Sequence, residues 1–184
     1  MTTGTTHSRA DLALRLRSLA FAAGQTILTV VFALLAIAAA PLPYRARYAL
    51  ITRWTALNLW WLRVTCRLDH RVEGLEHIPA EPAIVLCKHQ SAWETLALQR
   101  YFSPQVWVLK RELLRIPFFG WGLALLRPIA IDRGARRAAV EQILAQGEAR
   151  LADGCWVVIF PEGTRVAPGE RGRYRQGGAR LAAH

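Results

Sequence analysis

The stretch CWVVIFPEGTR, residues 155–165, decides the fold because it joins an apolar strand to a tight turn. Residues 155–160 form a short, entirely apolar run with strand character. Pro161 and Gly163 then predict a turn, since proline cannot donate to a sheet ladder and glycine tolerates unusual backbone angles. Short apolar runs of this kind alternate with helical stretches along the chain, which indicates an α/β layer structure, and the polar residues of this turn would lie at the strand's end.

Further strands and helices alternate before this stretch. The predicted strands are residues 83–87, 105–109, 128–131 and 155–160. Residues 135–153 carry apolar side chains at helical spacing, and Gly154 follows where a C-terminal cap would end that helix. The basic, glycine-rich segment after Arg165 predicts a loop. This pattern predicts one α/β domain over residues 68–184.

Residues 1–67 have a different character and predict a membrane-associated two-helix hairpin. Residues 21–40 contain no charge and are long enough to cross a bilayer. Pro41 and Pro43 break this helix, and residues 53–63 predict a second helix that is rich in tryptophan. Because arginines flank the apolar segment on both sides, we prefer a hairpin that enters and leaves by one face over a single span. A cleaved signal peptide is a further alternative, although its apolar run would be shorter.

Composition limits the classes of partner. The net charge of +11 favours an anionic membrane, a phosphorylated substrate or nucleic acid, and the hydrophobic content of 53% indicates that some apolar surface meets lipid. The cations are spread along the chain, and nucleic-acid binding gives the apolar N-terminus no role, so nucleic acid is disfavoured. Cys66, Cys87 and Cys155 are widely spaced without a CxxC pair, which argues against disulfides and zinc and for a cytoplasmic environment.

The segment KHQSAWE, residues 88–94, directly follows the first predicted strand. It places His89 at the strand end and a carboxylate, Glu94, five residues later. A neutral imidazole can take the proton of an alcohol, and a carboxylate can fix the ring's tautomer and orientation. However, Ser91 and Glu94 also fit a capping box at the start of a helix. Both interpretations of Glu94 stay open.

Two further segments offer groups that bind anions. Arg165 of FPEGTR can grip a phosphate with two parallel hydrogen bonds, and Thr164 can donate another, although the segment could simply be a turn. Lys110 and Arg133 flank an apolar, aromatic stretch, LRIPFFGWGLALL. That arrangement fits a phosphate headgroup or a membrane surface, and it equally fits a buried helix with snorkelling cations.

Taken together and in this order, the segments resemble the 1-acylglycerol-3-phosphate acyltransferases of the glycerolipid acyltransferase family. His89 and Glu94 match the family's first motif (HX4E here), residues 110–133 resemble its second, and residues 160–165 reproduce its FPEGTR motif letter for letter. The chain departs from the family by carrying glutamate where aspartate is usual. The family also continues with a further strand and a Val/Ile-Pro motif, so we expect the C-terminal part of the domain to be missing after His184.

The resemblance implies a mixed-sheet α/β domain that transfers an acyl group to 1-acylglycerol-3-phosphate and gives phosphatidic acid. His89 would be the general base and Glu94 its orienting acid. The acyl thioester donor would be acyl-CoA or acyl-carrier protein, without a cofactor, a metal or a covalent intermediate. The enzyme would act on membrane lipid, with its catalytic domain on the cytoplasmic face of the cell membrane. The implied substrate-binding residues are Lys110, Arg133, Glu162, Gly163, Thr164 and Arg165.

Two alternatives to this function remain. The acceptor could be a different lysolipid. The chain could also be a non-catalytic protein that binds anionic lipid, as its basic charge and predicted hairpin allow, although lipid binding alone requires neither His89 nor FPEGTR.

Overall fold

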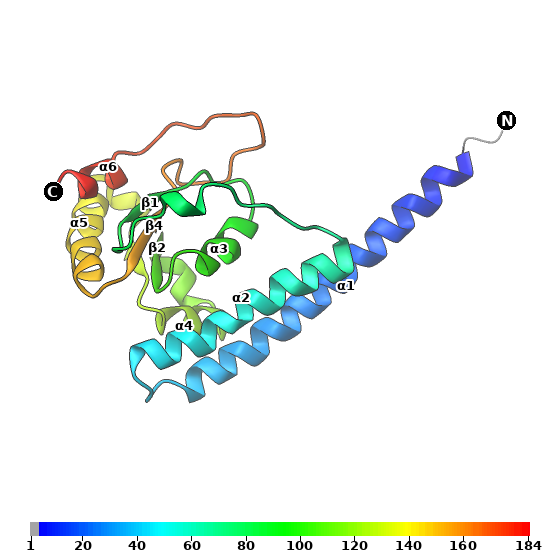
Figure 1. The fold of residues 1–184 in the computed structure, drawn as a ribbon, viewed down its shortest axis with the longest axis horizontal. Coiled ribbons are helices and arrows are strands. Elements are labelled where there is room, and N and C mark those ends of the chain that lie inside the picture. The colour runs from blue at the N-terminus through cyan, green and yellow to red at the C-terminus, as the bar shows by residue number, and fades with distance from the viewer. Residues whose placement is uncertain (1–3) are drawn as a thin grey trace.

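The computed structural model describes residues 4–184 as a helical hairpin lying along an α/β domain (Figure 1). The first three residues of the predicted N-terminal unit lie outside this range. Helix α1 spans Gly4–Ala38 and helix α2 spans Tyr44–Cys66, and the two pack against each other along much of their length. Within the described range, one segment, Ala10–Ala38, is long and apolar enough to cross a membrane by length and composition.

The second helix of the hairpin begins earlier than the sequence suggested. It starts at Tyr44 rather than Arg53, because Pro43 has the fixed φ that suits the start of a helix. Arg47 then fastens the hairpin turn to the rest of the molecule. Its Nε donates to the carbonyl of Leu125 at 3.0 Å, while its Nη1 donates to a carbonyl of the turn at 3.0 Å. The turn is therefore held against the α/β domain.

Four strands form one sheet in the order β1-β4-β2-β3. The strands are β1 (Ile84–Leu86), β2 (Gln105–Lys110), β3 (Ile129–Ile131) and β4 (Trp156–Ile159). All four lie where the sequence predicted strands. Each described pairing is parallel, whereas we expected a mixed sheet. A crossover segment separates each strand from the next along the chain, which lets neighbouring strands run in the same direction.

The crossovers are short apart from one long helix. They comprise α3 (Trp93–Ala97) with η2 (Leu98–Arg100), η3 (Arg111–Arg115) with α4 (Phe119–Ala124), and η4 (Arg133–Ala135) with α5 (Arg136–Ala152). The short helix η1 (Leu75–His77) precedes the sheet, and α6 (Gly177–Ala182) follows it. Helix α5 confirms the prediction for residues 135–153.

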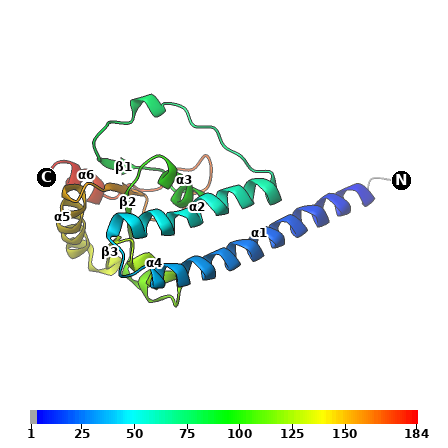
Figure 2. The ribbon, with the colours of Figure 1, turned by 60° about the horizontal axis from the view of Figure 1, so that its bottom comes forward.

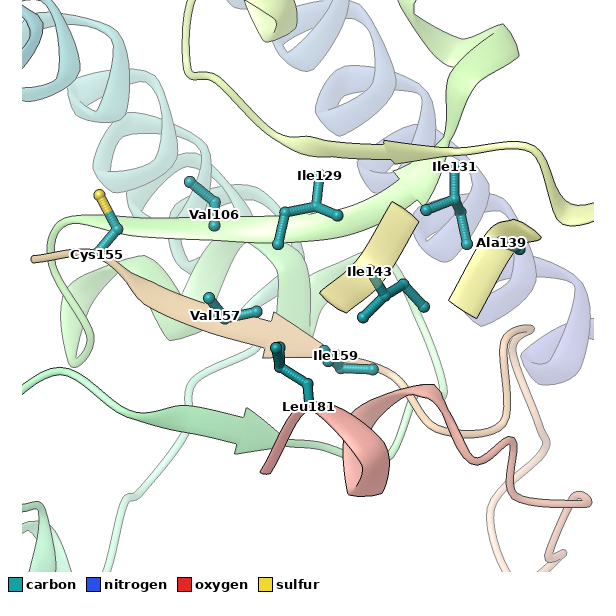
Figure 3. Close-up of a cluster of buried hydrophobic side chains, with 9 residues drawn as sticks. All are labelled: Val106, Ile129, Ile131, Ala139, Ile143, Cys155, Val157, Ile159 and Leu181. Carbon is teal, nitrogen blue, oxygen red and sulfur yellow. The ribbon is translucent and has the colours of Figure 1, made fainter. Parts of the chain in front are cut away.

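Helices cover both faces of the sheet. Along β2, Val106 points to the α5 face and Trp107 to the hairpin face, as strand alternation requires. Figure 3 shows the core under α5 and α6, which consists of Val106, Ile129, Ile131, Ala139, Ile143, Cys155, Val157, Ile159 and Leu181. The core on the hairpin face consists of Ala36, Tyr48, Ile51, Trp107, Leu126 and Val158.

The short helix α6 corrects the prediction that everything after Arg165 is loop. Its first two residues, Gly177 and Gly178, are buried. A Cβ on Gly178 would lie 2.6 Å from a methyl of Leu86, and one on Gly177 would lie 2.7 Å from a methyl of Ile143. These glycines allow the helix to pack closely, although in the sequence they suggest only flexibility.

Candidate active site

The two sequence motifs meet at the carboxyl edge of β1 and β4. Because these strands are parallel neighbours, with Leu86 beside Ile159, the segments that follow them leave the sheet side by side. The N–H of Val166 donates to the carbonyl of His89 at 2.8 Å. The imidazole of His89 stacks on the ring of Phe160, with centroids 4.1 Å apart and planes 19° apart. The fold thus places FPEGTR directly beside His89.

His89 and Glu94 face each other within one turn. The imidazole Nδ1 lies 3.4 Å from the Glu94 Oε2, and the two side chains are 15% and 14% exposed. This separation exceeds an ordinary hydrogen bond of about 2.7–3.2 Å, as is common for catalytic pairs before a substrate binds. Within residues 4–184 the other ring nitrogen, Nε2, has no hydrogen-bond partner. The geometry leaves Nε2 available to a ligand.

The same carboxylate also accepts backbone N–H groups of the turn that leads into helix α3, in the pattern of a capping box. Its Oε2 accepts from the N–H of Ser91 at 3.0 Å, and its Oε1 accepts from the N–H of Gln90 at 3.2 Å. The Ser91 hydroxyl in turn accepts from the N–H of Trp93 at 3.0 Å. The cap contacts and the His89 contact are therefore made by one Glu94 side chain at the same time.

Glu162 of FPEGTR is an internal anchor. Its side chain is fully buried, and its Oε1 accepts from the N–H of Gly172 and from the Lys88 Nζ, both at 3.0 Å. These bonds, the one from Gly172 first, lower the pKa of Glu162. Lys88 also donates to the carbonyl of Glu170 at 2.6 Å. Glu162 and Lys88 together tie the loop after FPEGTR to the segment that carries His89.

Two guanidinium groups flank Gly163. Its backbone has a φ of 68°, which favours glycine, and its carbonyl accepts a hydrogen bond from the Arg133 Nη1. A Cβ at this position would lie 2.7 Å from the Arg175 Nε. Burial, followed by the nearby charge of Arg175, lowers the pKa of Arg133. Sequence reasoning did not identify Arg175, whose only signal was the RYR pattern within the basic tail.

A cleft of about 1310 Å³ connects these turns to the helical hairpin. Its ionisable lining comes from the two turns, from η4 and from the loop after FPEGTR, and includes His89, Arg133, Arg173 and Arg175. Its apolar lining comes from the strands and helices, and includes Val30, Ile51, Trp107, Leu109, Phe119, Leu123 and Leu126. A cavity with both kinds of lining suits an amphipathic ligand better than a purely polar one.

The cleft contains most of the residues that the sequence nominated for substrate binding. Arg133 and residues 162–165 line it, and Arg165 is exposed with no ion pair within the described residues. Lys110 ends β2 beside Ile131 but lies outside the cleft lining. Glu94 lies behind His89 rather than on the cleft wall.

Comparison with known proteins defines the class. The model of the Acyltransferase family matches residues 69–184, so the chain belongs to this family. It is 49% identical over 144 residues to the 1-acyl-sn-glycerol-3-phosphate acyltransferase of Pseudomonas aeruginosa, covering 78% of this chain and 56% of that protein. The enzyme of the same name from Saccharomyces cerevisiae is 30% identical over 118 residues, covering 62% of this chain and 39% of that protein.

A solved structure shares the fold. The crystal structure of the 1-acyl-sn-glycerophosphate (LPA) acyltransferase PlsC from Thermotoga maritima superposes with a TM-score of 0.71 at 22% identity. The match covers 94% of this chain and 70% of that one. The chain thus spans about half the length of the Pseudomonas relative and a smaller share of the yeast one.

Proposed function

We propose that this chain transfers a fatty acyl group from an acyl thioester to the free hydroxyl of 1-acylglycerol-3-phosphate, giving phosphatidic acid. Membership of the acyltransferase family and the activity named for its relatives support this reaction. The observation that carries the proposal is the position of His89 and Arg165 on adjoining turns of one amphipathic cleft. A base can deprotonate the hydroxyl of a phosphorylated alcohol, and an anion-binding group beside it can hold the phosphate so that the hydroxyl is correctly positioned to attack.

In the proposed reaction, the oxygen of the acceptor hydroxyl attacks the thioester carbonyl carbon while the His89 Nε2 takes the proton from that hydroxyl. The carbon–sulfur bond then breaks, and the imidazolium gives its proton to the departing sulfur, so the donor leaves as a free thiol and His89 returns to its neutral form. Glu94, which lies at Nδ1, would orient the ring and stabilise the imidazolium. The donor is acyl-CoA or acyl-carrier protein, which acts as a co-substrate, and no metal or prosthetic group takes part.

Arg165 and Arg133 would bind the acceptor phosphate. Arg165 immediately precedes Val166, whose N–H bonds to the carbonyl of His89, so a phosphate on Arg165 would lie close to the base. A guanidinium can meet two phosphate oxygens at once. Because Lys110 lies outside the cleft lining, Arg133 takes the place in this proposal that the sequence suggested for Lys110.

The hairpin would attach the enzyme to the cell membrane with the catalytic domain on the cytoplasmic face. Helix α1 has the necessary length and hydropathy, and most of its apolar segment is exposed. Since Arg47 binds the hairpin turn to the carbonyl of Leu125 in the α/β domain, the turn would stay on the same side of the bilayer as that domain.

An acceptor panel tests this proposal. The purified chain in detergent is given acyl-CoA or acyl-carrier protein together with lysophosphatidate, glycerol-3-phosphate or a lyso-aminolipid. We expect transfer to be fastest with lysophosphatidate, with phosphatidic acid as the product, and none in His89→Ala. Faster transfer to another lysolipid would contradict the proposed acceptor. A folded, lipid-binding chain that transfers to none of them would instead support the non-catalytic alternative.

A further inference from the structure

The segment that joins β2 to β3 exposes aromatic side chains outside the cleft. Ile116, Phe118 and Trp121 are 43%, 45% and 49% exposed, and none of them lines the cleft. The rings of Phe118 and Trp121 lie 5.3 Å apart between centroids and form one apolar surface. The sequence left open whether this stretch is a buried helix; its first part is exposed, whereas Gly120, Gly122 and Leu126 in its second part are buried.

This surface is held by a compact turn rather than by a loose loop. A Cβ on Gly120 would lie 2.5 Å from the carbonyl oxygen of Leu113, so α4 packs directly on the backbone of η3. Phe118 has a φ of 60°, which non-glycine residues rarely adopt. Backbone strain of this kind persists where the surrounding structure enforces it, often for function. Here it accompanies an exposed aromatic ring.

The aromatic surface adjoins the most apolar helix of the molecule. Helix α4 packs on α1, and a Cβ on Gly122 would contact Ala33 and Ala36 at 3.5–3.9 Å. Leu34 and Leu35 of the same part of α1 are 52% and 41% exposed. Figure 2 shows α4 beside α1, on the other side of the molecule from the loop that carries η1.

Cations border this surface. Lys110 and Arg115 are exposed within the segment, whereas the exposed Arg111 is already ion-paired with Asp132 at 3.3 Å and the exposed Glu112 carries the opposite charge. Aromatic rings beside basic side chains match the interface of an anionic bilayer, where rings lie among the headgroups and cations meet phosphates.

We propose that residues 110–121 form a second membrane-contact surface, distinct from the hairpin. Ile116, Phe118 and Trp121 enter the interface of an anionic bilayer, and Lys110 and Arg115 bind lipid phosphates. Leu113 and Phe119 of the same segment, each 37% exposed, line the cleft. Bilayer contact here therefore brings lipid to the edge of the cleft.

Depth-dependent fluorescence quenching tests this surface. Cys66 and Cys87 are replaced by serine, while Cys155 is kept because it is buried. An environment-sensitive fluorophore is attached to Phe118→Cys or Trp121→Cys in the full chain, bound to phosphatidylcholine–phosphatidylglycerol vesicles with brominated acyl chains. The matched control is Leu75→Cys, at an apolar residue of η1 that is 45% exposed.

We expect several-fold stronger quenching at positions 118 and 121 than at position 75, and weaker quenching when phosphatidylglycerol is omitted. Using two label positions keeps the test decisive if one variant fails to fold. Quenching no greater than at position 75 would overturn the proposal. A label that is quenched neither by the brominated lipid nor by aqueous iodide would also overturn the proposal, since a protein partner would then cover the surface. The readout does not depend on acyl transfer, so it stands or fails separately from the proposed function.

Discussion

The two turns at the sheet edge each contain a glutamate, and the two carboxylates have different surroundings. Glu94 lies 3.4 Å from an imidazole nitrogen and remains 14% exposed. Glu162 is fully buried and accepts two hydrogen bonds of 3.0 Å, from Lys88 and from the backbone of Gly172. The Glu94 carboxylate therefore lies where it could stabilise a positive charge on His89, whereas the Glu162 carboxylate is already paired with the Lys88 ammonium.

This difference indicates a proposed catalytic role for Glu94 and a structural role for Glu162, although both lie in motifs that are only a few residues long. Glu94 contacts His89, the proposed general base, so its charge would matter during the proposed reaction. Glu162 joins three chain segments, so its charge matters for the folded state. Substitutions that remove charge but preserve shape should therefore have opposite effects on rate and stability at the two positions.

The largest effect is expected from Glu94→Gln. An amide still accepts the N–H bonds that cap α3, so we expect a near-normal Tm. It cannot compensate the imidazolium or hold the tautomer, and the comparable loss in a Ser-His-Asp enzyme is on the order of 10⁴ in turnover. We expect turnover to fall by at least about a hundredfold. Rates of acyl transfer and thermal unfolding measured on one preparation check this.

Three further variants sharpen the result. His89→Ala should be equally inactive, and the double variant little worse, because the pair acts as one unit. Glu94→Asp should keep partial activity, since it retains the charge on a shorter side chain. If Glu94→Gln turns over normally while His89→Ala is inactive, Glu94 is only a helix cap.

Arg165 extends the comparison from the carboxylates to the substrate. If its guanidinium binds the acceptor phosphate, Arg165→Ala should lose about 2–5 kcal/mol of binding and transition-state stabilisation. Arg165→Lys should rescue only part of this, because an ammonium lacks the planar fork. The control is Arg171→Ala, at an exposed arginine of the same tail that does not line the cleft. Unchanged KM and kcat for Arg165→Ala would contradict the assignment.

The sequence predicted the positions of the strands well, because each strand carries a strong local signal, although it did not predict that all pairings are parallel. The apolar runs around Val85, Val106, Ile129 and Val157 appear in the structure as β1, β2, β3 and β4. Parallel neighbours then bring the ends of β1 and β4 together, so the meeting of His89 with FPEGTR follows from topology.

Features that depend on tertiary contacts could not be predicted in the same way. Gly177 and Gly178 suggested a loop, but they are glycine because Ile143 and Leu86 leave no room for a side chain. The approach of Arg175 to Gly163 likewise depends on the position of the loop between them. Glu162 holds this loop by accepting a hydrogen bond from the N–H of Gly172, ten residues later in the sequence. Nothing in local periodicity reports such contacts between distant segments.

The smallest effect on rate is expected from Glu162→Gln, which completes the comparison. The substitution keeps an acceptor for Gly172 but removes the charge that faces Lys88, so Tm should fall while kcat per folded molecule changes little. Because the pKa of Glu162 is lowered from its ordinary value of 4.5, its stabilising contribution is full above that value and is lost as pH falls through the folded-state pKa. The Tm difference between this variant and the unmodified chain should therefore be largest near neutral pH and should shrink toward zero in acid. Glu170→Gln is the matched control, since only the backbone carbonyl of Glu170 takes part in this network. Thermal unfolding followed across pH decides the matter, and a Tm difference that stays constant into acid would show that the Glu162 charge does not hold the loop.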